Sequence, residues 1–93
     1  MKLTNEMLKV HKYICLELKN QRLLKQLKQD RVAFDLGISP SYLSNLENGR
    51  RNSTALTTYL AIAEYYDVDF NIIVDNALTK MKLDDKANIQ KKE

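Results

Sequence analysis

Short polar side chains that could hydrogen-bond to DNA bases gather between residues 40 and 48, in the segment PSYLSNLEN. If this segment is helical, Leu43 and Leu46 share one face and point into a core. The remaining faces then carry four side chains that donate or accept hydrogen bonds: Ser41, Ser44, Asn45 and Asn48. Arg50 and Arg51 follow directly, and their cationic groups suit backbone phosphates. These residue types and spacings predict a helix that enters a DNA groove.

The residues before this helix supply the turn that would position it. The apolar residues of segment 29–36 have the spacing of one buried stripe, which predicts a short helix. The stripe consists of Val32, Ala33 and Leu36. Gly37 can adopt positive φ and end that helix tightly. Ser39 can cap the free N–H groups of the next helix, and Pro40 suits its first position. Together these features predict a helix-turn-helix motif over residues 29–48.

The motif resembles the Cro and phage-repressor family of helix-turn-helix proteins, also called the xenobiotic-response-element or lambda-repressor-like family. Seven residues fall in the register of that family: Gln29, Ala33, Gly37, Ser39, Leu43, Glu47 and Gly49. The resemblance covers about residues 14–74. Two loop positions depart from it, since Ser53 stands near the usual proline and Asp67 replaces the usual glycine. The resemblance implies an all-α, five-helix lambda-repressor-like DNA-binding domain, here with extended first and last helices.

Length and composition agree with a single small helical domain. The chain has 93 residues with only two glycines and one proline, which favours helices over a turn-rich sheet. The single Cys15 cannot form an internal disulfide, and no apolar run approaches the roughly 20 residues of a membrane span. We therefore expect a cytoplasmic protein that does not enter a membrane. The expected domain is 1–83, followed by a charged, disordered tail at 84–93.

Three further helices are predicted around the motif. The first has Met7, Val10, Ile14 and Leu18 on one stripe, with Thr4 or Asn5 as its cap. The fourth, capped by Asn52 or Ser53, has a stripe of Leu56, Tyr59, Leu60, Ala63 and Tyr66. The fifth, capped by Asp69, carries Phe70, Ile73, Val74, Ala77, Leu78 and Met81. The first helix begins about two turns earlier than in the family, so residues 5–13 must cover either the end of the last helix or a second copy of the chain.

Charge is distributed unevenly along the chain. Residues 1–31 hold eight Lys or Arg and three acids, whereas residues 54–78 hold four acids and no Lys or Arg. One face is therefore expected to be basic and to suit phosphates, while the other is acidic and faces solvent or a partner.

The resemblance also implies roles for individual residues. Its base-reading positions correspond to Pro40, Ser41, Ser44 and Asn45, and the Asn45 amide can bond adenine N6 and N7 together. The expected phosphate contacts come from Gln29, Ser39, Tyr42, Asn48, Arg50, Arg51 and Asn52. Tyr42 is expected to reach the sugar-phosphate backbone through its hydroxyl, and packing against the first helix is the alternative. Arg22 and Glu47 are expected to form a structural ion pair.

The predicted function is sequence-specific binding of double-stranded DNA by a transcriptional regulator. The resemblance implies a dimeric repressor of a bacterium, phage or mobile element that reads a palindromic operator. Surface for a homodimer could come from Ile72, Val74, Leu78, Met81 and Leu83, or these residues could simply pack the long helices together. The alternative is an antitoxin-like module whose acidic helices bind a partner protein.

Enzymatic activity has little support in the sequence. No nucleophile can be paired with a base, and there is no glycine loop that would cradle phosphate. His11 and Cys15 lie one helical turn apart, but two ligands are too few for a metal site. We therefore expect no enzyme, no metal and no cofactor.

Overall fold

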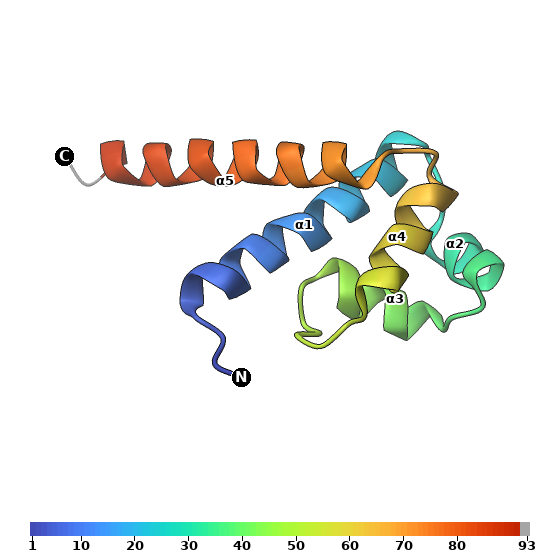
Figure 1. Cartoon of the computed structure of the whole chain (residues 1–93). Helices are drawn as coiled ribbons and strands as arrows, with labels where there is room; N and C mark the ends of the chain where they lie inside the picture. The colour runs from blue at the N-terminus through green and yellow to red at the C-terminus, as the bar shows by residue number, and fades with distance from the viewer. Residues whose placement is uncertain (92–93) are drawn as a thin grey trace.

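In the computed structural model, which describes the backbone of residues 1–91 and the side chains of residues 1–88, the chain forms five α-helices (Figure 1). They are α1 (Asn5–Leu24), α2 (Gln29–Leu36), α3 (Pro40–Glu47), α4 (Leu56–Tyr65) and α5 (Phe70–Lys91). No strand occurs among these residues. The prediction of an all-α, five-helix lambda-repressor-like fold is confirmed.

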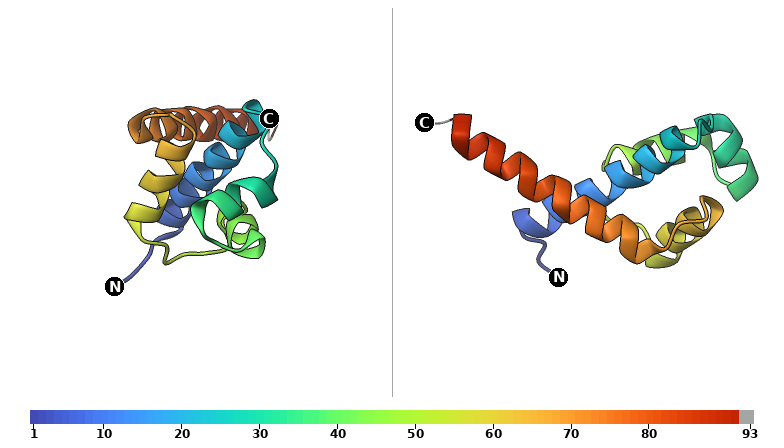
Figure 2. Two further views of the ribbon diagram at one scale, coloured as in Figure 1. Left: turned by 90° about the vertical axis from the view of Figure 1, so that its right-hand side faces the viewer. Right: turned by 90° about the horizontal axis from the view of Figure 1, so that it is seen from above.

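The two long helices, α1 and α5, pack against each other and cross, as the view from above shows (Figures 1 and 2). Near the start of α1, Lys9 forms an ion pair with Asp85 and the Tyr13 hydroxyl donates to Asp84 Oδ2 at 2.6 Å. Closer to its end, Glu17 contacts Lys80. The three short helices gather at the other end of this pair, where α2 and α3 form the helix-turn-helix.

Glu17 is a buried carboxylate in the surface where α1 and α5 contact each other, which we call the α1–α5 seam. The sequence pattern did not single it out. Its residue is 2% exposed. Its oxygens accept from Gln21 Nε2 at 2.9 Å, Asn76 Nδ2 at 3.1 Å and Asn20 Nδ2 at 3.4 Å, as well as from the Lys80 ammonium. Burial by itself would raise the pKa of Glu17, but the hydrogen bonds from Lys80 and the amides together hold it below the ordinary value.

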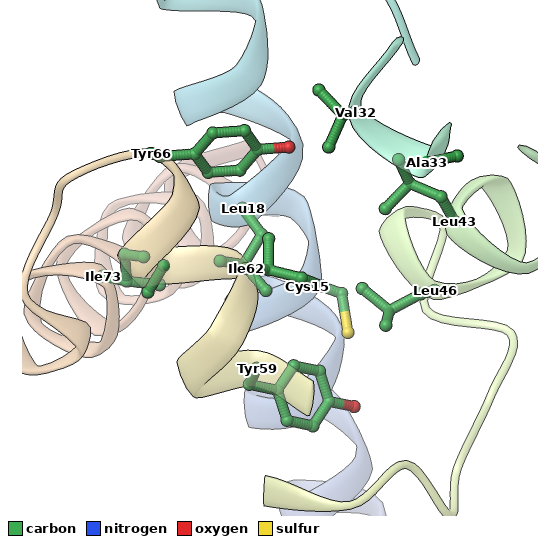
Figure 3. Packing of buried hydrophobic residues seen from close by; sticks show 11 residues of the cluster. Cys15, Leu18, Val32, Ala33, Leu43, Leu46, Tyr59, Ile62, Tyr66 and Ile73 are labelled. Atoms are coloured by element: carbon green, nitrogen blue, oxygen red, sulfur yellow. The ribbon is translucent and has the colours of Figure 1, made fainter. Parts of the chain in front are cut away.

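Side chains from every helix meet in one hydrophobic core (Figure 3). The largest apolar contributions come from Leu18, Leu43, Leu46, Ile62, Tyr66 and Ile73. The predicted stripe of α4 was partly wrong, because Leu56 is 61% exposed and Leu60 is 42% exposed. Ile62 is buried instead, so the inward positions are Tyr59, Ile62, Ala63 and Tyr66. This i, i+3, i+4, i+7 pattern is the narrow stripe by which a short helix contacts a core.

The N-termini of α1 and α3 follow the predicted capping signals. Thr4 caps α1, since its Oγ1 accepts from Met7 N at 3.1 Å. Ser39 caps α3 in the same way, accepting from Tyr42 N at 3.0 Å. The cap prediction for α4 was wrong: its N-cap is Ala55, without a side-chain hydrogen bond. Asn52 and Ser53 precede the first turn of α4 by too many residues to reach its free N–H groups.

Four helices end in the same backbone turn, although only two of these turns contain glycine. Gly37 (φ 71°) follows α2 and Gly49 (φ 68°) follows α3. The equivalent positions after α1 and α4 are Gln26 (φ 58°) and Asp67 (φ 57°). Asp67 is where the family usually has glycine, and the chain keeps the left-handed conformation there despite the Cβ.

The expectation of a disordered segment from residue 84 was wrong for residues 84–91. There α5 continues as a helix to Lys91; residues 92–93 lie outside the described residues. The contacts of Lys9 and Tyr13 with Asp85 and Asp84 explain the difference, since they tie this part of α5 to the first turns of α1. The extra turns of α1 contact α5 at Asp84 and Asp85, whereas residues 86–88 beyond these contacts are exposed. Within residues 1–91, no helix combines the length and the apolar character needed to cross a membrane.

Candidate nucleic-acid interface

The outer face of α3 carries the side chains expected to read bases. Pro40 and Ser41 are exposed, and Ser44 and Asn45 are half-buried. The inner face buries Leu43, Leu46 and Glu47. The structure therefore places all four predicted base-reading residues on the solvent side of one short helix, which the core holds from behind.

A buried network behind this face joins three helices. Arg22 Nε donates to Glu47 Oε2 at 2.8 Å, and Arg22 Nη2 donates to Glu47 Oε1 at 3.1 Å. A third N–H of the same guanidinium, on Nη1, donates to the Leu27 carbonyl at 2.9 Å. The hydrogen bonds that Arg22 donates to Glu47 raise the pKa of Arg22 above its ordinary value. The predicted ion pair is thus present. It is bidentate and almost completely buried, and it fixes the end of α3 against α1.

Gln29 belongs to the same network as well as to the expected phosphate contacts. Its Nε2 donates to Glu47 Oε1 at 2.9 Å, so one of its two amide N–H bonds is directed inward. The N-cap of α2, Lys28, makes no side-chain capping bond. The first N–H groups of α2 therefore have no capping side chain and remain available to an anion, with the second Gln29 N–H beside them.

The turn after α3 directs two arginines to the edge of the same face. Gly49 N donates to the Leu46 carbonyl at 3.0 Å, and Arg50 N donates to the Asn45 carbonyl at 3.0 Å. A Cβ at position 49 would lie 3.1 Å from Lys12 Cγ. The backbone there also has a φ of +68°, which side chains with a Cβ rarely adopt. Glycine is therefore required for the chain to pass this close to α1.

The side chains at this edge are organised by contacts that the sequence did not reveal. Arg51 Cζ lies 4.3 Å from the centroid of the Tyr42 ring. Arg50 Nη1 lies 3.5 Å from Asn45 Oδ1. Asn48 Nδ2 donates to the Ser44 carbonyl at 2.9 Å, so this predicted phosphate ligand uses a donor to end α3. Spacing could not reveal the contacts of Arg50 and Arg51, because they depend on the course of the chain after Gly49.

Two other predicted phosphate ligands have different surroundings. Ser39 uses its oxygen as a hydrogen-bond acceptor in the cap of α3, which leaves its hydroxyl hydrogen able to donate to an anion. Asn52 is exposed in the loop between α3 and α4. Both lie close in sequence to the ends of α3.

The His11 and Cys15 pair is part of the packing between α1 and α4. His11 Nε2 contacts the Tyr59 hydroxyl and lies 3.6 Å from Cys15 Sγ. Burial raises the pKa of the Cys15 thiol to about 11 and lowers the pKa of His11. A fully buried thiol with this pKa stays protonated near neutral pH and does not act as a nucleophile.

Comparison with known proteins places this geometry in a family. A comparison with curated protein sequences gave no match. A family model described as helix-turn-helix matches residues 18–73, which extend from the middle of α1 into the first turn of α5. The matched part holds the Arg22–Glu47 network, the exposed face of α3 and the two arginines. The chain therefore belongs to the helix-turn-helix family of Cro and phage-repressor type, whose members are DNA-binding regulators.

Proposed function

We propose that this protein is a transcriptional repressor that binds a specific double-stranded DNA sequence as a homodimer. The observation that carries the proposal is the exposed face of α3, with hydrogen-bonding side chains in its centre and Arg50 and Arg51 at its edge. A helix of this kind fits the major groove, where base edges present distinct donors and acceptors.

The contacts divide into those that specify sequence and those that position the protein. Pro40 can touch a thymine methyl group, and Ser41 and Ser44 can reach base edges at short range. Asn45 is the best candidate for adenine, provided that Arg50 leaves its Oδ1 when DNA binds. The phosphate contacts come from the N-terminus of α2 with Gln29, and from the residues around the two ends of α3.

The homodimer is supported by apolar side chains on the outside of the α1–α5 pair. Of the five residues considered from sequence, Met81 is buried and Val74 and Leu78 are half-buried, so they serve the chain's own packing. Ile72 and Leu83 remain 45% and 61% exposed. Leu83 lies with Leu16 beside a groove of about 250 Å³ between the two helices. A two-fold dimer through this face would present two copies of α3 to a palindromic site.

Selection of bound sequences from a random duplex pool at near-physiological salt tests the proposal, together with the stoichiometry of the selected complex. We expect one enriched palindrome bound by two chains. An enriched sequence without symmetry, bound by one chain, would contradict the dimer and leave sequence-specific binding intact. Weak binding without enrichment, lost as salt rises, would contradict sequence-specific repression.

A protein partner is the second candidate function, and one surface favours it. A groove of about 330 Å³ lies at the corner between α4 and α5. Its apolar lining consists of Leu60, Ala63, Val68 and Phe70, and its acidic residues are Glu64, Asp67 and Asp69. An antitoxin-like role would use such a surface for a basic partner protein. Stable co-purification with one protein, combined with failure of the DNA selection, would support this candidate over the first.

A further inference from the structure

Arg50 and Arg51 are neighbours in sequence but make different contacts. The Arg50 guanidinium points back along α3 to the Asn45 side chain. The Arg51 guanidinium instead lies over the face of the Tyr42 ring, 4.3 Å from its centroid. No Asp or Glu among the described side chains forms an ion pair with Arg51. Its charge is therefore held in place and still available to a phosphate.

The Tyr42 ring has less freedom to move than most surface side chains. Tyr42 lies in the first turn of α3, where its backbone N bonds to the Ser39 cap. Its ring is half-buried and packs against the hydrophobic core. A guanidinium that stacks on such a ring keeps its N–H edges free to donate. A guanidinium that stacks on the ring loses less side-chain entropy when it meets the DNA backbone than one that is free in solvent.

We propose that Tyr42 is a positioning residue for DNA binding, which holds the Arg51 guanidinium in place to bind a backbone phosphate through its aromatic ring and not its hydroxyl. This inference rests on the proposed DNA binding, but it does not require a dimer or a particular operator. It also replaces the expectation from sequence that the Tyr42 hydroxyl contacts the sugar-phosphate backbone.

The test compares Tyr42→Phe, which keeps the ring, with Tyr42→Leu, which removes it. The probe is a random-sequence duplex of fixed length, titrated by fluorescence anisotropy at low and at moderate salt. Tyr42→Phe should bind like the parent, whereas Tyr42→Leu should lose about two- to fivefold in affinity, the size of an exposed cation–π contact. Arg51→Gln should weaken binding and lower the salt slope by about 0.9, the equivalent of one phosphate.

A double-mutant cycle separates this role from a merely structural one. In an Arg51→Gln background, Tyr42→Leu should cause no further loss, because the ring then has no guanidinium to hold. Tyr65→Leu is the matched control: it removes a half-buried tyrosine that bonds Asp35, and it should leave DNA affinity unchanged. Thermal melts of each variant check that the fold is retained.

Two results would overturn the inference while the proposed function stands. One is an equal loss in Tyr42→Phe and Tyr42→Leu, which would assign the effect to the hydroxyl. The other is the same loss from Tyr42→Leu with and without Arg51, which would show that the ring acts independently. If the parent protein does not bind the duplex at all, the proposed function and this inference both fail.

Discussion

Two buried carboxylates, Glu47 and Glu17, hold the two halves of the molecule together in different ways. Glu47 lies in the helix-turn-helix half, and the side chain of its partner Arg22 is only 9% exposed. Glu17 lies in the α1–α5 seam, and the side chain of its partner Lys80 is 50% exposed. The first pair is sealed inside the protein, whereas water can reach the cationic partner of the second.

This difference indicates where the molecule must be rigid. A bidentate pair that is closed to water fixes the angle between two helices, and losing either partner leaves a charge buried alone. It stands directly behind the face that we propose reads DNA. A seam made of amides and one accessible lysine can rearrange, because its donors can turn toward water. We therefore expect changes at Glu47 to affect stability far more than changes at Glu17.

The largest expected effect is that of Glu47→Ala. This change leaves the Arg22 guanidinium buried without its carboxylate and removes the Gln29 contact. The free energy of unfolding should fall by about 3–5 kcal/mol, measured by chemical denaturation. Glu64→Ala, which removes an exposed acid from α4, should change stability by less than about 0.5 kcal/mol. A Glu47→Ala variant as stable as the parent would show that the sealed pair contributes little.

Glu17→Gln should have a smaller effect that depends on pH. The pKa of Glu17 is lower in the folded chain than its ordinary value of 4.5. In the window between the two values the unfolded chain binds more protons, so this contribution to stability is present above pH 4.5 and is lost as pH falls through the folded pKa. The free energy of unfolding of the variant should be about 1–3 kcal/mol lower than that of the parent near neutral pH. Its deficit relative to the parent should shrink in acid, as measured by denaturation at several pH values.

If Glu17→Gln lowered the free energy of unfolding as much as Glu47→Ala, the contrast between the two carboxylates would disappear. Lys80→Ala supplies a second check, because an exposed cationic partner should contribute less than about 1 kcal/mol. Neither variant removes a side chain that we expect to contact DNA, since both residues lie in the α1–α5 seam and not on the face of α3.

Asn45→Ala tests the function assigned to the helix-turn-helix half. Discrimination between the selected duplex and a mismatched one should fall by about 1–3 kcal/mol, while affinity for random DNA stays nearly the same. Arg50→Ala should instead weaken binding to both duplexes and flatten the salt dependence. Competition binding at two salt concentrations measures both effects. If both variants lost affinity equally for the selected and the mismatched duplex, the division between base-reading and phosphate-binding residues would be wrong.

The smallest effect concerns how helices end in the two halves. The turns of the helix-turn-helix use Gly37 and Gly49, whereas the turn after α1 uses Gln26 with φ 58°. Gln26→Gly removes the Cβ from a left-handed position and should stabilise the protein by about 0.5–1 kcal/mol, after the entropy cost of glycine. Thermal denaturation measures the change. Gly37→Ala should destabilise the protein by a similar amount. A destabilising Gln26→Gly together with a stabilising Gly37→Ala would show that φ does not decide these positions.

Much of the helix-turn-helix half could be predicted because its determinants are local. The stripe of α2, the glycine at its end, and Ser39-Pro40 at the start of α3 each act within a few residues, so the bounds of both helices agree with the structure. The partnership of Arg22 with Glu47 came from the resemblance to a family, and the geometry agrees with it. The base-reading role of α3 is still a proposal.

The α1–α5 half could be predicted only in outline, since its decisive contacts join residues far apart in sequence. Asn76 and Lys80 reach Glu17 from 59 and 63 positions away, and no periodic pattern marks a polar seam of this kind. The same limit explains the error over residues 84–91, whose charge and lack of aromatic residues are typical of a disordered tail.

The order of the helices and the helix-turn-helix follow from the amino-acid sequence alone, because caps, glycines and apolar periodicity act over single turns. Three features depend on packing between helices: which face of α4 is buried, the contacts of α1 with Asp84 and Asp85 of α5, and the position of Arg51 over Tyr42. These features depend on where separate helices meet in space. Packing and long-range hydrogen bonds therefore determine them, and neither follows from the spacing of residues along the chain.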